Sequence, residues 1–229
     1  SYRSEESFEE KFGLFLNKLL MELMTKYILA PTINAVKQDI LKLNSKIIYS
    51  DTPSFDFKEI DTSRLEAEIK NPNRNVVRML LKTLAYEEQD DLLPSRWEIE
   101  HIFPQKWQTN YFPNIPEETI KDKIEHIGNK LPFEKKLNIV AGNGYFGKKK
   151  ALYKASKIVI TKKMGDSIID NWNLDSITER DLRITDIIVK TLKRWNNEYM
   201  AQSSGDQKEM PTEEQLAQIE EFKKKGWIK

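Results

Sequence analysis

The sequence predicts a mainly helical protein with one small β-hairpin, and three observations support this fold class. Apolar residues recur three or four positions apart through most of residues 1–92, which is the period of an amphipathic helix. Residues 97–103 are interpreted as a strand, and residues 129–137 as a second strand or a loop. Charged residues make up 32% of the chain and hydrophobic residues 39%, a balance typical of a solvated, mostly helical protein that buries a core.

The first part of the chain, residues 1–92, is predicted to be a helical subdomain. Its helices are expected at residues 7–29, 32–47, 62–70 and 73–87. Pro31 ends the first of them, and residues 50–61 are predicted to be a loop or a short extended piece. Stripes of aromatic and aliphatic residues at helical spacing form core more often than ligand sites. We therefore expect this subdomain to pack onto the centre of the chain.

Residues 93–200 are predicted to form a second unit around the two strands. A long insertion at 104–127 joins the strands and carries a helix near 116–126. The pair Asn143-Gly144 marks a turn after the second strand. Further helices are expected after that turn, at 145–157, 157–172 and 178–199.

The last of these helices is predicted to begin at a capping box formed by Thr178 and Asp181. Residues 201–229 are predicted to be a terminal segment outside the core. We expect a linker at 201–211, which is rich in small and polar residues, followed by a short charged helix at 212–226.

Composition excludes several classes of protein. The chain has no cysteine, so it has no disulfide framework and no cysteine-based zinc site. No apolar run reaches the length of a membrane span and no signal peptide is visible, so we expect a cytoplasmic protein with no membrane partner. The first residue is Ser rather than Met, and we expect a piece of a longer protein.

The net charge is only +1, but the lysines are concentrated in one region. Residues 130–163 hold ten lysines and a single acidic residue, whereas residues 86–100 hold six acidic residues and one arginine. A basic stretch suits contact with a phosphate backbone, which makes DNA the expected partner. The side chains predicted to bind nucleic acid are Lys148, Lys149, Lys150 and Lys154. The alternative is a solvated, lysine-rich helix face.

The residues around the first of the two histidines indicate phosphodiester chemistry. His101 directly follows Glu100. A histidine supplies a general base near neutral pH, and a carboxylate beside it suits a divalent metal ion that absorbs developing charge. If 97–103 is a strand, the two side chains point to opposite faces. A bend at Pro104 or a twisted hairpin is then needed to bring both to one phosphate.

Two asparagines nine positions apart, Asn129 and Asn138, extend this polar set. An amide oxygen can bind a hard metal ion without adding charge to the site. We expect Glu100 and Asn138 as metal ligands, with Asn143 kept as a further candidate ligand. With two histidines and no cysteine, the metal is expected to be Mg²⁺ or Mn²⁺ rather than Zn²⁺. For the second histidine, His126, packing and metal binding both stay open.

Together these positions resemble an HNH nuclease core (the His-Me finger or ββα-metal core). They resemble still more closely the C-terminal half of GmrSD-like type IV restriction enzymes, over roughly residues 95–200. The matching residues are Glu100, His101, Ile102, Phe103, Pro104, Gln105, Trp107, His126, Gly128, Asn129, Leu137, Asn138, Asn143, Phe146, Lys149, Lys150, Tyr153 and Ser156. Residues Lys130-Leu131-Pro132 depart from the family's usual run at that place.

The resemblance implies a helical domain enclosing a ββα-metal HNH core, with residues 145–157 as the helix of the ββα unit. It implies a metal-dependent endonuclease, the effector half of a restriction or defence protein that nicks or cuts foreign or modified phage DNA. Asn129 is then expected to orient the base, His101, or its loop. Lys149, which shares a helix face with Phe146 and Tyr153, is expected to reach the site and neutralise the phosphate, while the two aromatic residues are interpreted as core.

The same resemblance implies partners outside this chain. In related systems an N-terminal domain senses modified DNA and hydrolyses a nucleotide, and this chain has no Gly-rich phosphate loop of its own. One catalytic centre cuts one strand, so double-strand cleavage needs a homodimer or two encounters.

Two alternatives stay open at this point. A catalytically weak module that binds nucleic acid through its lysines is disfavoured by the intact set of Glu100, His101, Asn129 and Asn138. A ribonuclease or toxin with the same core is not excluded, because such a core attacks phosphate without reading the sugar.

Overall fold

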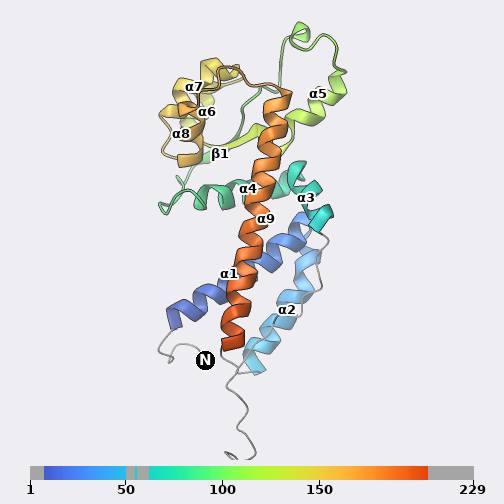
Figure 1. The fold of residues 1–229 in the computed structure, drawn as a ribbon, viewed down its shortest axis with the longest axis vertical. Helices are drawn as coiled ribbons and strands as arrows, with labels where there is room; N and C mark the ends of the chain where they lie inside the picture. Colours follow the sequence, from blue (N-terminus) through green and yellow to red (C-terminus); the bar gives the residue numbers. More distant parts are fainter. Residues whose placement is uncertain (1–7, 50–54, 56–61, 206–229) are drawn as a thin grey trace, which may run out of the picture.

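The protein is mainly helical, with one two-stranded antiparallel sheet (Figure 1). The structure is a computed structural model that describes residues 8–49, 55 and 62–205. A long C-terminal helix, α9 (Leu174–Gly205), runs past both the N-terminal helices and the region of the sheet. It contacts elements from both parts of the chain, including α1, α4 and α5. None of the helices in the described part is both long and apolar enough to cross a membrane.

The N-terminal helices lie within two residues of their predicted positions. They are α1 (Phe8–Leu29), α2 (Ile33–Tyr49), α3 (Thr62–Lys70) and α4 (Arg74–Tyr86). The last of these begins at Asn73, whose side chain accepts a hydrogen bond from the backbone N–H of Asn75. The predicted loop at 50–61 lies outside the described residues, except for Phe55.

The sheet pairs β1 (Trp97–His101) with β2 (Lys130–Glu134) in antiparallel register, with His101 opposite Lys130. The first strand is two residues shorter than predicted. Pro132 lies inside β2, which a two-stranded sheet tolerates because each of its strands is an edge strand. The insertion between the strands contains η2 (Thr109–Tyr111), α5 (Glu117–Ile124) and η3 (Ile127–Asn129).

Short helices follow the sheet: α6 (Lys135–Ala141), α7 (Phe146–Lys154) and α8 (Val159–Asp166). The first of them, α6, was not expected, because residues 129–137 were predicted to be a second strand or a loop. The helix predicted at 157–172 is wrong in its second half, since α8 ends at Asp166. Residues 167–173, between α8 and α9, are not helical. Trp172 is buried there, and its indole N–H donates to the side-chain oxygen of Asn129.

The predicted capping box at Thr178 and Asp181 is also wrong. Helix α9 begins one turn earlier, where the Asn173 side chain accepts hydrogen bonds from the backbone N–H and the hydroxyl of Ser176. Asp181 is a buried residue inside the helix, and its carboxylate bonds to other segments. Residues 201–205 are still helical, so the predicted linker does not begin at 201, and its remainder lies outside the described residues.

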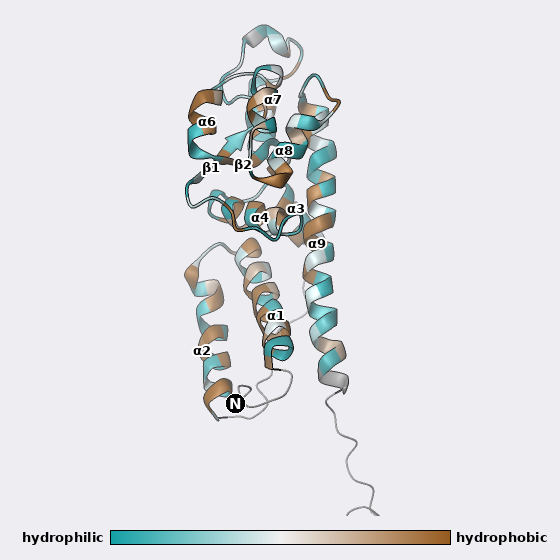
Figure 2. Ribbon diagram, turned by 90° about the vertical axis from the view of Figure 1, so that its left-hand side faces the viewer, coloured by the Kyte–Doolittle hydropathy of each residue, from teal (hydrophilic) through white to brown (hydrophobic). Residues whose placement is uncertain are grey.

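Buried apolar side chains form two clusters, and α9 contributes to both. One cluster joins α1, α3 and α4 to Ile184, Ile188 and Leu192 of α9. The other lies around the sheet, α5 and α7, and includes Ile177 from the start of α9. Hydrophobic and hydrophilic residues therefore both occur along the length of α9 (Figure 2). A division of the chain near residue 92 and again near residue 200 stays a prediction.

Candidate active site

Most of the predicted site residues line one cavity of about 390 Å³ beside the end of β1. Glu100 and His101 come from the strand, Asn138 from α6, Asn143 from the turn that follows it, and Lys149 from α7. Although Glu100 and His101 are neighbours in the strand, both reach this cavity, because β1 ends at His101 and the chain then turns away. Asn129 does not line the cavity.

Glu100 is buried, and its carboxylate is held by two groups from α7. The ammonium of Lys149 lies 2.6 Å from Oε1, and the hydroxyl of Tyr153 donates to the same oxygen at 2.7 Å. Lys149 also donates to the backbone carbonyl of His101 at 2.6 Å. Burial lowers the pKa of Lys149, and the charge of Glu100 opposes this effect. Burial also raises the pKa of the Tyr153 phenol, which therefore stays a hydrogen-bond donor.

The second carboxylate oxygen of Glu100, Oε2, accepts no hydrogen bond from any residue that the structure describes. Within the same described part, the side-chain amide of Asn138 has no hydrogen-bond partner either. Asn143 differs, because its amide accepts from the backbone N–H of Lys106 at 3.0 Å and donates to the carbonyl of that residue. Of the two candidate asparagines, Asn138 is thus the one with an unused oxygen at the cavity.

His101 faces a carboxylate at the end of α5. Its Nε2 atom lies 3.4 Å from Glu125 Oε1 and 3.5 Å from the side-chain amide nitrogen of Gln105. The hydrogen bond with His101, followed by the contact with Lys130, holds the pKa of Glu125 well below its usual range despite partial burial. The insertion between the strands therefore contributes to the surroundings of the histidine, a role that the sequence analysis did not assign to Glu125.

Asn129 is completely buried and ties the loop after His101 to two other segments. Its side-chain oxygen accepts from the backbone N–H of Phe103 at 2.7 Å and from the indole of Trp172 at 3.2 Å. Its amide nitrogen donates to the carbonyls of Phe103 and Ile124, each at 3.0 Å. These bonds fix the chain immediately after the histidine, so Asn129 acts on the cavity through the backbone rather than by touching it.

The other histidine, His126, lies outside the cavity. Its Nδ1 atom is 2.7 Å from Oδ2 of Asp181, which also accepts from Lys123 at 3.0 Å. The other oxygen of Asp181 accepts from the backbone N–H of Gly128 at 2.7 Å. His126 thus helps to dock the segment before β2 onto α9, which supports the packing interpretation left open above.

The four lysines predicted to bind nucleic acid do not form one face. Lys148 and Lys154 are exposed, but Lys149 is buried against Glu100. Lys150 donates to the carbonyl of Ile169 at 2.8 Å. The reason is that α7 packs onto the sheet through Phe146, Lys149 and Tyr153, so Lys149 cannot also face solvent beside its neighbours. The expected grouping of Lys149 with the surface lysines is corrected accordingly.

Sequence reasoning missed the polar role of Tyr153, which was interpreted as core. Its position four residues after Lys149 on one helix face was the available signal, because such residues are neighbours on a helix. No local pattern indicated Glu125 or Trp172, since both meet the site through contacts between segments distant in sequence.

The cavity offers few ligands for a metal ion. Within the described ranges there is no group of three or more His, Cys, Asp or Glu side chains suited to one. The donors without a partner in the described part of the chain include Oε2 of Glu100 and the amide oxygen of Asn138. One carboxylate and one amide oxygen fit Mg²⁺, which keeps several of its own waters and is bound through one or two carboxylates. They do not fit zinc, which prefers three or four protein ligands of histidine or cysteine type.

Comparison with family models identifies the class of protein, a nuclease of the restriction-endonuclease type. The matching family is described as GmrSD restriction endonucleases, C-terminal domain, and the match spans residues 54–187. Since this is more than half of the chain, the protein belongs to that family, which confirms the resemblance found in the sequence. No curated protein and no solved structure matches the chain.

Proposed function

We propose that this chain is an HNH-type, metal-dependent endonuclease domain that hydrolyses phosphodiester bonds of DNA. The observation that carries the proposal is the single cavity lined by His101, Glu100 and Asn138, which come from β1 and α6. Membership in a restriction-endonuclease family supports a nucleic-acid substrate. The order of two antiparallel strands followed by α6 and α7 is consistent with a ββα arrangement.

In this proposal His101 is the general base. It lines the cavity, and a ring nitrogen within hydrogen-bond reach of a water there can take the proton as that water attacks phosphorus. Glu125, 3.4 Å from Nε2, stabilises the imidazolium that forms. Asn129 supports this step by holding the backbone of Phe103, which keeps the histidine loop in place.

Glu100 and Asn138 are the proposed ligands for a hydrated Mg²⁺ or Mn²⁺ ion. When bound, the ion would stabilise negative charge that develops on the phosphate and the leaving oxygen. Lys149 is better described as a positioning residue than as a group that touches the phosphate. Its ammonium is already held by Glu100 Oε1 and the His101 carbonyl, so it fixes the carboxylate with Oε2 left unused.

The wider role follows from the family and remains part of the proposal. The domain would act on foreign or modified phage DNA as the effector half of a defence protein. A separate sensing domain that hydrolyses a nucleotide would direct it, and two copies would be required for simultaneous double-strand cleavage. Lys148 and Lys154, exposed on α7, are the proposed contacts to the DNA backbone.

The experiment that tests the proposal is the nicking of supercoiled plasmid by the purified chain across a magnesium titration. Nicking is expected with magnesium and should stop on addition of a chelator. An RNA of matched length, incubated in parallel, separates the nuclease of the proposal from a ribonuclease. Cleavage that continues unchanged in the chelator, or cleavage of the RNA alone, would contradict the proposal.

Asn138→Ala and Asn143→Ala form a matched pair in the same titration. Asn138→Ala removes an amide without a hydrogen-bond partner in the described structure, so it should raise the magnesium concentration needed for half-maximal nicking and leave the melting temperature near that of wild type. Asn143→Ala removes the anchor of Lys106 and should affect stability more than the titration. The opposite result would move the ligand role to Asn143.

A further inference from the structure

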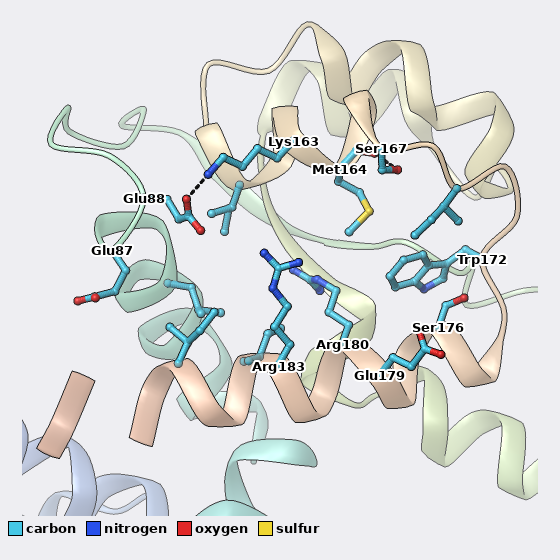
Figure 3. A pocket seen from close by; sticks show the side chains of 15 residues that line it. Glu87, Glu88, Lys163, Met164, Ser167, Trp172, Ser176, Glu179, Arg180 and Arg183 are labelled. Carbon is cyan, nitrogen blue, oxygen red and sulfur yellow. Dashed lines mark hydrogen bonds and ion pairs between the residues drawn. The ribbon is translucent and has the colours of Figure 1, made fainter. Parts of the chain in front are cut away.

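A second cavity, of about 290 Å³, lies between the end of α4, α8 and the first half of α9. It shares none of its lining residues with the candidate active site. Much of its wall is apolar and includes Ile160 and Ile184. Met164 and Trp172 also line it (Figure 3). Two arginines one turn apart on α9, Arg180 and Arg183, extend their guanidinium groups into this cavity.

The Arg183 guanidinium forms no hydrogen bond or ion pair with any residue that the structure describes. The three hydrogen bonds of Arg180 all leave from Nη1, toward the carbonyls of Ile127, Gly128 and Lys130. Its Nε and Nη2 atoms therefore have no partner in the described part of the chain. Unused guanidinium donors thus face a cavity with apolar walls.

No carboxylate of the described cavity lining neutralises these two cations. Glu88 is paired with Lys163, and Glu87 is bonded to Arg194 at 2.8 Å. Glu179 also lines the cavity but forms no ion pair with either arginine. Burial lowers the pKa of Arg180 to about 10, and the charge of Arg183 adds to this effect. Arg180 is half-buried and Arg183 is exposed, and an anion that contacts both guanidinium groups would offset the repulsion between their charges.

We propose that this cavity binds a phosphate-bearing small molecule of mononucleotide size. The phosphate would lie between Arg180 and Arg183, since planar guanidinium forks match phosphate oxygens with paired hydrogen bonds. The apolar part of the ligand would lie against Trp172 and Met164. Pockets for small ligands usually enclose about 300 Å³ or more, so a cavity of about 290 Å³ lies near the lower end of this range and suits a ligand of about one nucleotide. The inference does not depend on the proposed nuclease activity.

Isothermal titration calorimetry on the full chain tests the proposal with three probes: adenosine 5′-monophosphate, inorganic phosphate and adenosine. Adenosine 5′-monophosphate should bind, inorganic phosphate should bind more weakly, and adenosine should not bind measurably. A parallel thermal melt should show a higher melting temperature with the nucleotide, because a ligand that binds only the folded state stabilises it.

Arg183→Ala is the decisive variant, because Arg183 has no partner in the described structure and its removal should leave the ligand-free melting temperature unchanged. It should weaken nucleotide binding by about tenfold or more, the usual size of a lost charge-assisted hydrogen bond. Lys193→Ala removes the same charge from an exposed position on the same helix and should bind as wild type does.

Three results would overturn the proposal: no binding of either phosphate-bearing probe, undiminished binding by Arg183→Ala, or equal losses in Arg183→Ala and Lys193→Ala. Binding of inorganic phosphate alone would overturn the assignment of a mononucleotide-sized ligand.

Discussion

At the scale of single residues, the buried pair of Glu100 and Lys149 organises the candidate active site. The carboxylate makes an ion pair with Lys149 and accepts a hydrogen bond from Tyr153, and all of these groups are buried. A buried ion pair often adds little net stability, but breaking it leaves one charge without a partner at a high cost. The pair is therefore expected to be sensitive to change on either side.

Lys149→Met should lower the free energy of unfolding by about 3–5 kcal/mol, because it leaves the Glu100 carboxylate buried and uncompensated. Lys148→Met is the matched control, since Lys148 is exposed and its loss should change stability by less than about 0.5 kcal/mol. Chemical denaturation measures both. The double variant Glu100→Gln/Lys149→Met should recover part of the loss. A loss of unfolding free energy equal to the sum of the losses in Glu100→Gln and Lys149→Met would show that the pair is not coupled.

The contact between His101 and Glu125 predicts a pH dependence of stability. The folded protein holds the pKa of Glu125 well below the ordinary value of 4.5, mainly through its hydrogen bond with His101. Glu125 therefore contributes stability that is present above pH 4.5 and is lost as the pH falls further, because the unfolded chain takes up the proton first. In Glu125→Gln, the free energy of unfolding should fall less steeply with acidification below that pH. Equal slopes in the variant and wild type would contradict the assignment.

At the scale of secondary-structure elements, the close approach of η3 to α9 positions the sheet. A Cβ atom added at Gly128 would lie 2.2 Å from the carbonyl oxygen of Ile177 and 2.6 Å from Oδ1 of Asp181. Only glycine permits this approach, which lets the Gly128 N–H bond to Asp181. The neighbouring Asn129 then lies where it can hold the loop after His101.

Gly128→Ala should therefore be strongly destabilising, by about 3 kcal/mol or more, because backbone atoms have to move to make room. Gly13→Ala is the matched control in a helix, since a Cβ atom there meets no atom within 4 Å. That change should stabilise the protein by about 0.5–1 kcal/mol, as expected for alanine replacing glycine inside a helix. Thermal melts of the two variants that shift by the same amount would refute the packing argument.

Sequence patterns predicted these elements well where local periodicity dominates and poorly where tertiary contacts decide. The helices α1 to α4 follow apolar stripes and were placed within two residues. Helix α6 was missed because it is short, and its apolar residues Ile139 and Val140 are exposed rather than buried. The start of α9 was misplaced because Asp181, with the spacing of a cap, is instead used to bind Gly128 and His126.

The candidate site shows the same division. The pattern of Glu100, His101 and Asn138 was visible in the sequence, and these residues do line one cavity. The sequence also placed Lys149 on the helix face of Phe146 and Tyr153, but it could not reveal that this lysine is buried in an ion pair with Glu100, because the partner depends on how α7 meets the sheet. The contribution of Glu125 was equally hidden, since it depends on how the insertion folds back on the strand.

At the scale of the whole molecule, α9 joins the two apolar clusters into one structure. Ile177 packs beside the sheet, whereas Ile184, Ile188 and Leu192 pack with the N-terminal helices. Because one continuous helix is shared, we expect the two regions to unfold together despite the predicted division near residue 92. Differential scanning calorimetry should show one transition whose calorimetric and van't Hoff enthalpies agree. Two separate transitions would instead support independent domains.

The central claim, that the cavity around His101 is a nuclease active site, is tested most directly by comparing the two histidines of the chain. The measurement is the rate of magnesium-dependent plasmid nicking by His101→Ala and His126→Asn, with folding of each variant checked by circular dichroism. His101 lines the cavity, whereas His126 binds Asp181 outside it. We predict that His101→Ala loses about two or more orders of magnitude in rate, as expected for a lost general base, and that His126→Asn keeps the wild-type rate. Full activity of His101→Ala, or equal losses in both folded variants, would contradict the claim.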